Sequence, residues 1–105
     1  MFTEGRSVSK YPLRLVYVQL EETEPFDLKM GVSVSKKYFK KASDRNYFKR
    51  VLRETYRHNK HIISDRIDKP FAFMLFYQTK DRLSFKEIEM KTIELFKKFA
   101  ALENL

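Results

Sequence analysis

The chain has 105 residues, and Lys and Arg outnumber Asp and Glu by 22 to 14, which gives a net charge of +8. This length suits one domain, residues 1–105, with a modest core that ten phenylalanines make rich in aromatic groups. The absence of cysteine excludes disulfides and thiolate metal ligands, and no apolar run is long enough to cross a membrane. The N-terminal residues also lack a signal-peptide stretch. We therefore expect a cytoplasmic protein whose acidic partner is nucleic acid rather than a membrane surface.

Three segments have the composition of β-strands. Residues 11–20 mix β-branched and aromatic side chains, and an acidic turn is expected at residues 21–27. Residues 29–35 alternate larger and smaller side chains, which predicts a strand with one apolar face (Met30, Val32, Val34) and one small face (Gly31, Ser33, Ser35). Residues 70–77 form a continuous apolar run, typical of a buried strand.

Two further segments have helical periodicity. At about 100° of rotation per residue, a helix capped by Ser43 or Asp44 places its apolar residues on one arc, namely Phe48, Val51, Leu52, Thr55 and Ile62. Ser84 and Glu87 have the spacing of a capping box, which opens a final helix with apolar positions Phe85, Ile88, Thr92, Leu95, Phe96, Phe99 and Leu102. The order strand, strand, helix, strand, helix predicts an α+β or α/β sandwich: one central sheet with helices packed on one face.

The charge excess lies in one segment, residues 36–60. It contains ten Lys and Arg residues and only two acids, Asp44 and Glu54, while the rest of the chain carries twelve of each sign. Within the helix, one side carries Arg45, Asn46, Lys49, Arg50, Arg53 and Arg57. Like charges four residues apart repel one another, so such a row favours a bound anion over a merely solvated face. Lys36, Lys37, Lys40 and Lys41 precede the helix, where phosphates bind well, although each of them is equally consistent with a solvated loop.

Other candidate sites are weaker. Asn46 is consistent with a base contact, with a phosphate-bound hydrated cation, or with first-turn capping. Several aromatic residues are suited to base stacking but are more often core, with Tyr17 the best of Tyr17, Tyr38, Phe39, Tyr47 and Tyr56. His58 and His61 have only Asp65 as a nearby third metal ligand. The sequence shows no catalytic triad and no Gly-rich phosphate loop, so it predicts no protein-borne catalysis.

These motifs together resemble the signature of the bacterial ribonuclease P protein component. The helix motif is Arg45-Asn46-x-x-Lys49-Arg50-x-x-Arg53-Glu54-x-x-Arg57, and the strand motif before it is Val32-Ser33-Val34-Ser35-Lys36-Lys37, followed by Ala42. The Phe2-x-x-Gly5 spacing, Leu15-Val16-Tyr17, the apolar strand and the closing helix are also similar to that family. The resemblance covers essentially the whole chain.

The resemblance implies an endoribonuclease holoenzyme in which the RNA subunit cleaves. The protein would bind that RNA and the 5′ leader of precursor tRNA, and would help the RNA-based active site hold Mg²⁺. By matching position, Arg45, Lys49 and Arg53 approach RNA phosphates, with Arg50, Arg57, Lys36 and Lys37 supporting them. Asn46 lies near a metal through RNA or water. Phe2, Tyr17 and Ser33 line the leader cleft. No strong protein metal site and no membrane partner are expected, and without RNA we expect a monomer.

The resemblance also carries expectations about the fold. The family contains a left-handed β-α-β crossover and an N-terminal helix that would precede Phe2 and is missing from this sequence. Phe39 stands near a position where the family commonly has glycine. Two alternatives stay open, a general nucleic-acid-binding or ribosomal-type domain and a stand-alone hydrolase that uses His58 and His61.

Overall fold

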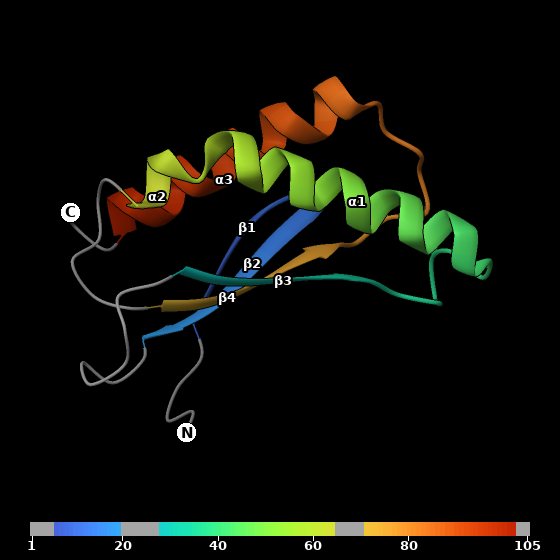
Figure 1. Cartoon of the computed structure of the whole chain (residues 1–105), viewed down its shortest axis with the longest axis horizontal. Helices are drawn as coiled ribbons and strands as arrows, with labels where there is room; N and C mark the ends of the chain where they lie inside the picture. The colour runs from blue at the N-terminus through green and yellow to red at the C-terminus, as the bar shows by residue number, and fades with distance from the viewer. Residues whose placement is uncertain (1–5, 20–27, 65–70, 103–105) are drawn as a thin grey trace.

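The computed structural model describes residues 6–19, 28–64 and 71–102, and it forms one sheet covered by helices on one side (Figure 1). The elements are β1 (Arg6–Lys10), β2 (Leu13–Gln19), β3 (Leu28–Val34), α1 (Ala42–Asn59), α2 (His61–Ser64), β4 (Phe71–Tyr77) and α3 (Phe85–Leu102). The predicted α+β sandwich with helices on one face is confirmed. The acidic turn expected at residues 21–27 lies outside the described residues.

The sheet has the strand order β1-β2-β4-β3. β2 pairs antiparallel with β1 and β4, whereas β3 pairs parallel with β4. β1 and the short helix α2 were not expected from the sequence. β1 reads RSVSK, and Val8 is its only apolar residue, so it carries no alternating pattern.

The connection between the two parallel strands passes over the sheet through α1 and α2. In Figure 1 both β3 and β4 run from left to right, β3 lies in front of β4, and the helices lie above them. The crossover is therefore left-handed, as the family resemblance implied. Most parallel crossovers are right-handed because strand twist favours that hand, so composition and periodicity alone would have suggested the opposite topology.

The hydrophobic core lies between the sheet and the helices. The sheet contributes alternate residues of its two central strands, including Leu13, Leu15, Tyr17, Phe73, Leu75 and Tyr77. The helices contribute Phe48 and Leu52 from α1 and Leu95, Phe96 and Phe99 from α3. α1 and α3 also share a buried polar contact, since the Thr92 hydroxyl lies 3.2 Å from the Thr55 hydroxyl. This packing fixes which side of α1 faces inward.

The two long helices begin differently. α3 has the predicted capping box: the Glu87 amide donates to Ser84 Oγ at 3.2 Å, and the Ser84 amide donates to the Glu87 carboxylate at 3.1 Å. α1 begins at Ala42 after Lys41, which makes no side-chain capping bond, so the expected cap at Ser43 or Asp44 was wrong. The Asp44 carboxylate instead binds Arg82, which is far away in sequence.

None of the helices within the described part of the chain has the length and apolar character needed to cross a membrane.

Candidate nucleic-acid interface

α1 separates apolar and cationic residues onto opposite sides. Phe48, Val51, Leu52 and Thr55 are buried against the sheet and α3. The outward side carries four exposed residues, Asn46, Arg50, Arg53 and Arg57, and two half-buried ones, Arg45 and Lys49. The helical-wheel prediction for α1 is confirmed, although Ile62 belongs to α2. We call Lys49, Arg50, Arg53 and Arg57, together with Asn46, the cationic face.

Both acids of the basic segment are held by cations at its margins. Arg82 Nη2 lies 3.2 Å from Asp44 Oδ1. Arg57 Nη2 lies 2.8 Å from each carboxylate oxygen of Glu54, which is also 3.7 Å from His58 Nε2. Lys49, Arg50 and Arg53 have no carboxylate partner among the described residues. The middle of the cationic face therefore keeps its full positive charge, because no nearby anion neutralises it.

Arg45 has a different environment from the other cations. Its Nη1 donates to two backbone carbonyls of the preceding loop, Phe39 O at 2.9 Å and Lys40 O at 2.8 Å. The side chain is half-buried by these contacts. Arg45 thus adds charge near the helix start but uses part of its hydrogen-bonding capacity to hold the loop, which its place in the sequence motif does not reveal.

The loop before α1 presents four exposed lysines around one buried aromatic ring. The Tyr38 and Phe39 amides both donate to Ser35 O at 3.1 Å, which forms a compact turn. Phe39 is buried, and its ring stacks on Phe48 at 4.7 Å between centroids. Lys36, Lys37, Lys40 and Lys41 remain exposed. We call residues 36–41 the lysine loop; the first turn of α1 follows it directly.

Of the three residues expected to line a leader cleft, the structure describes Tyr17 and Ser33, and these two lie on opposite faces of the sheet. Phe2 lies outside the described residues. Tyr17 is 4% exposed, and its ring packs under α3 with its centroid 4.7 Å from that of Phe99, so it does not line an open cleft. Ser33 is half-buried on the opposite side of the sheet, because it pairs with Phe76, three residues along β4 from Phe73, the partner of Tyr17. Val16, the neighbour of Tyr17, is the residue that points away from the helices.

On the side away from the helices, no other described element covers the sheet, and we call this side the open face (Figure 1). Its central residues are in register across three strands: Val16 pairs with Met74, which pairs with Gly31, and Arg14 pairs with Phe76, which pairs with Ser33. Met74 is 39% exposed. A Cβ on Gly31 would lie only 3.0 Å from the Met74 methyl group, so glycine gives that side chain room. An apolar centre flanked by Arg14 and Ser33 is suited to stacking bases beside a charged backbone. The sequence indicated the small face of β3 with Ser33, but not Met74 or Phe76, because β4 reads as an unbroken apolar run.

The described residues do not form the alternative metal site. His58 Nδ1 lies 3.2 Å from the Glu89 carboxylate on α3, both His58 and His61 are exposed, and Asp65 lies outside the described residues. No cluster of three His, Cys, Asp or Glu side chains suited to a metal occurs in the described part of the chain. Asn46 offers one exposed neutral oxygen. Mg²⁺ prefers several oxygen ligands, usually carboxylates or phosphates, so these residues alone do not fit a protein-borne magnesium site.

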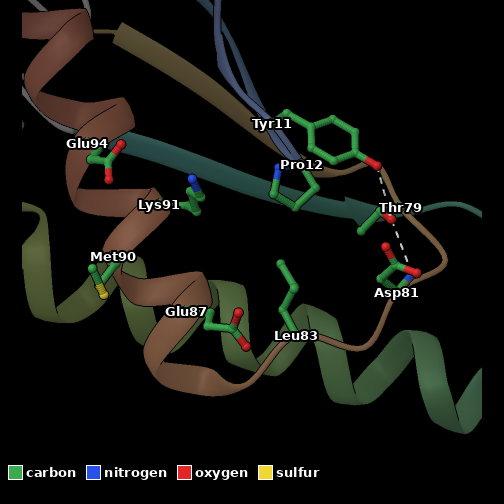
Figure 2. Close-up of a pocket in the computed structure, with 9 residues that line it drawn as sticks. All are labelled: Tyr11, Pro12, Thr79, Asp81, Leu83, Glu87, Met90, Lys91 and Glu94. Carbon is green, nitrogen blue, oxygen red and sulfur yellow. Dashed lines mark hydrogen bonds between the residues drawn. The ribbon is translucent and has the colours of Figure 1, made fainter.

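A pocket of about 380 Å³ opens between α3, the β1–β2 turn and the loop after β4 (Figure 2). It is lined by Tyr11, Pro12, Thr79, Asp81, Leu83, Glu87, Met90, Lys91 and Glu94. Three of these residues are acids and one is a lysine, so the rim repels phosphate rather than attracting it. The candidate interface is therefore the convex surface of α1 and the lysine loop, and this pocket is not part of it.

Comparisons with protein families, curated sequences and solved structures give matches to the same family. A family model described as Ribonuclease P matches residues 1–100. The curated ribonuclease P protein component of Porphyromonas gingivalis is 39% identical over 92 residues, which covers 85% of this chain and 67% of that protein. The structure of the RNase P protein from Thermotoga maritima aligns with a TM-score of 0.71 at 26% identity, over 90% of this chain and 84% of that one. The RNase P protein of Staphylococcus aureus gives 0.69 at 25% identity, over 90% and 81%.

Proposed function

This chain belongs to the ribonuclease P protein family, and we propose that it is the protein subunit of that ribonucleoprotein, an endoribonuclease that removes the 5′ leader of precursor tRNA in the cytoplasm. In this proposal the chemistry resides in the RNA subunit, and the chain supplies binding surfaces for that RNA and for the leader.

The observation that carries the proposal is the unneutralised charge of the cationic face. Lys49, Arg50 and Arg53 lie together on the outward side of α1, and the acids Asp44 and Glu54 are both engaged by other cations. The repulsion among neighbouring cations costs a few tenths of a kcal/mol per pair on a helix. A phosphate backbone relieves that repulsion and releases its own counterions on binding.

The proposal gives each cation a role that follows from its surroundings. Lys49, Arg50 and Arg53 approach phosphates directly, and Arg57 assists while it is shared with Glu54. Lys36 and Lys37 extend the field from the lysine loop. Arg45 contributes charge and holds the loop through its two carbonyl contacts.

The proposed leader surface is the open face of the sheet. The residues proposed to bind the leader are Ser33 and four residues that the register places around it, Val16, Met74, Phe76 and Arg14. Tyr17 is not among them, because it is covered by α3. Met74→Glu would place a carboxylate at the centre of this face. It is expected to weaken binding of precursor tRNA with a leader while leaving binding of mature tRNA unchanged, and equal effects on both would contradict this part.

Mg²⁺ enters the proposal only as the ion required by the RNA-based active site. Asn46 is placed beside the phosphate-binding cations, where it can donate to or accept from a metal-bound water. Its neutral amide is not enough to hold the ion without RNA oxygens.

The test is reconstitution of precursor tRNA cleavage with the ribonuclease P RNA of the same genome, at a Mg²⁺ concentration where the RNA alone is slow. Addition of the protein is expected to raise the cleavage rate. The triple variant Lys49→Gln, Arg50→Gln, Arg53→Gln is expected to lose this effect. The matched control, Lys80→Gln, Lys86→Gln, Lys97→Gln, removes the same charge from exposed residues elsewhere and should keep it.

The reconstitution also separates the alternatives. A general nucleic-acid-binding domain predicts similar affinity for unrelated structured RNAs and no effect on cleavage. A stand-alone hydrolase predicts activity without the RNA subunit that is lost in the variant His58→Ala, His61→Ala. Cleavage that is unchanged by the wild-type protein would remove the main proposal.

A further inference from the structure

Arg82 lies in the loop between β4 and α3, outside the sequence motif that marks the basic helix. Its side chain nevertheless reaches the start of α1, where Nη2 lies 3.2 Å from Asp44 Oδ1. The guanidinium also lies over two aromatic rings, 5.8 Å from the Phe39 centroid and 5.5 Å from the Phe48 centroid. One residue thus contacts the lysine loop, through Phe39, and the first two turns of α1, through Asp44 and Phe48.

The backbone on both sides of Arg82 is fixed by a single buried hydroxyl. Tyr77 at the end of β4 donates from its hydroxyl to Asp81 O and accepts from the Leu83 amide at 3.2 Å. The Asp81 amide also donates to Thr79 Oγ1 at 3.2 Å, a contact drawn in Figure 2. The Tyr77 ring stacks on Phe48 at 4.7 Å. Arg82 therefore projects from a rigid support that is anchored in the sheet.

The start of α1 needs such a support because it has no capping side chain of its own. Asp44 is the acid of its first turn, and it binds Arg82 rather than a backbone amide. Arg45 binds the carbonyls of Phe39 and Lys40 in the lysine loop. Phe39 is therefore held by two arginines, by Arg82 at its ring and by Arg45 at its carbonyl, and the lysines lie in the same segment between Ser35 and α1.

We propose that Arg82 is a positioning residue for RNA binding: it orients the lysine loop and the first turn of α1 through Asp44, Phe39 and Phe48, without itself contacting phosphate. This inference rests on the proposed function. Without Arg82, only a fraction of the molecules hold the lysine loop and the first turn of α1 in the binding-competent arrangement. The apparent affinity for RNA is the intrinsic affinity multiplied by that fraction.

The sharpest test uses Asp44, because two explanations predict opposite signs. Asp44→Asn removes an acid beside the cationic face, so simple electrostatics predicts tighter binding to RNA. Positioning predicts weaker binding for Asp44→Asn, because the ion pair with Arg82 is lost, but by a smaller factor than for Arg82→Met, which also removes the contacts with Phe39 and Phe48. The double variant should be no weaker than Arg82→Met alone. The readout is the dissociation constant for the ribonuclease P RNA of the same genome.

Lys80→Met is the matched control for Arg82→Met. It removes one positive charge from the same exposed loop, but Lys80 makes no hydrogen bond, ion pair or cation–π contact among the described residues. Loss of an exposed ion pair and two cation–π contacts is expected to weaken binding about three- to tenfold for Arg82→Met, and less than twofold for Lys80→Met. Equal effects of the two variants would overturn the inference.

Two further measurements exclude other causes. A direct phosphate contact by Arg82 would lower the slope of log affinity against log salt by about one, whereas positioning leaves the slope unchanged. General destabilisation is monitored by melting temperature, with Ser84→Ala as a control that breaks the α3 cap and should not affect RNA binding. A lowered slope, or tighter binding of Asp44→Asn, would refute the positioning role. Wild-type protein that fails to bind the RNA would instead refute the proposed function.

Discussion

Replacement of Arg53 by Gln tests the cationic face most directly, because stability and RNA affinity should change in opposite directions. Arg53 is exposed and has no partner among the described residues. It lies one helical turn from Lys49, Arg50 and Arg57, and like charges at such spacing destabilise a helix by about 0.2–0.5 kcal/mol per pair. Since Glu54 shields Arg57, relief of the remaining repulsion amounts to about 0.5 kcal/mol, or an increase in melting temperature of roughly 2–4 °C.

The same change should weaken RNA binding in a way that depends on salt. Loss of one phosphate contact lowers the log–log salt slope by about 0.9, so the affinity defect should be about 3.5 times larger at 50 mM than at 200 mM salt. Fluorescence anisotropy with labelled RNA measures the slope, and thermal unfolding measures the stability. Lys97→Gln on α3 serves as the control, because it removes one exposed charge outside the interface. An unchanged slope, or a clear fall in melting temperature, would refute the assignment of Arg53 to a free outward position.

Three other changes probe neighbouring features. Leu52→Ala removes a fully buried side chain next to Arg53 and should lower the free energy of unfolding by about 2–5 kcal/mol in urea denaturation. Glu54→Gln releases Arg57 from its ion pair and should tighten RNA binding at low salt; weaker binding would show that the pair orients Arg57. Burial raises the pKa of the Tyr77 phenol above its ordinary value. The protonated phenol therefore stabilises the fold at neutral pH, and that contribution should be lost as pH rises above about 10. Tyr77→Phe should remove this part of the alkaline loss of stability.

The sequence was sufficient to predict the basic helix because the spacing of its cations and the spacing of its apolar residues both indicated a helix. The cations and the apolar residues of α1 each follow the helical period, so their separation onto two sides follows from spacing alone. The strands at β2, β3 and β4 were likewise predicted within a few residues of their observed bounds. For β2, it was harder to predict on which side of the sheet each residue lies. Leu15, Val16, Tyr17 and Val18 are all apolar, so the strand shows no alternation. The pattern of β2 therefore did not indicate that Tyr17 lies under the helices and Val16 on the other face.

Residue patterns in the sequence could not predict contacts between segments that are distant along the chain. Asp44 has the residue type and position of a helix cap, and nothing in the local sequence indicates that its carboxylate binds a residue 38 positions later. β1 was missed because four of its five residues are polar or charged, and its pairing with β2 supplies the structure that its own composition does not. In both cases tertiary context overrides a local preference.

The stack of Phe39, Phe48 and Tyr77 links the lysine loop, α1 and β4 through two ring contacts of 4.7 Å each. While Arg82 is also in place, a loop tied to the core in this way cannot open without disturbing the sheet. Amide hydrogens of Tyr38 and Phe39 should therefore exchange with solvent deuterium at the rate set by global unfolding, although they lie next to four exposed lysines. The binding surface would then be as durable as the domain itself and already ordered before RNA arrives.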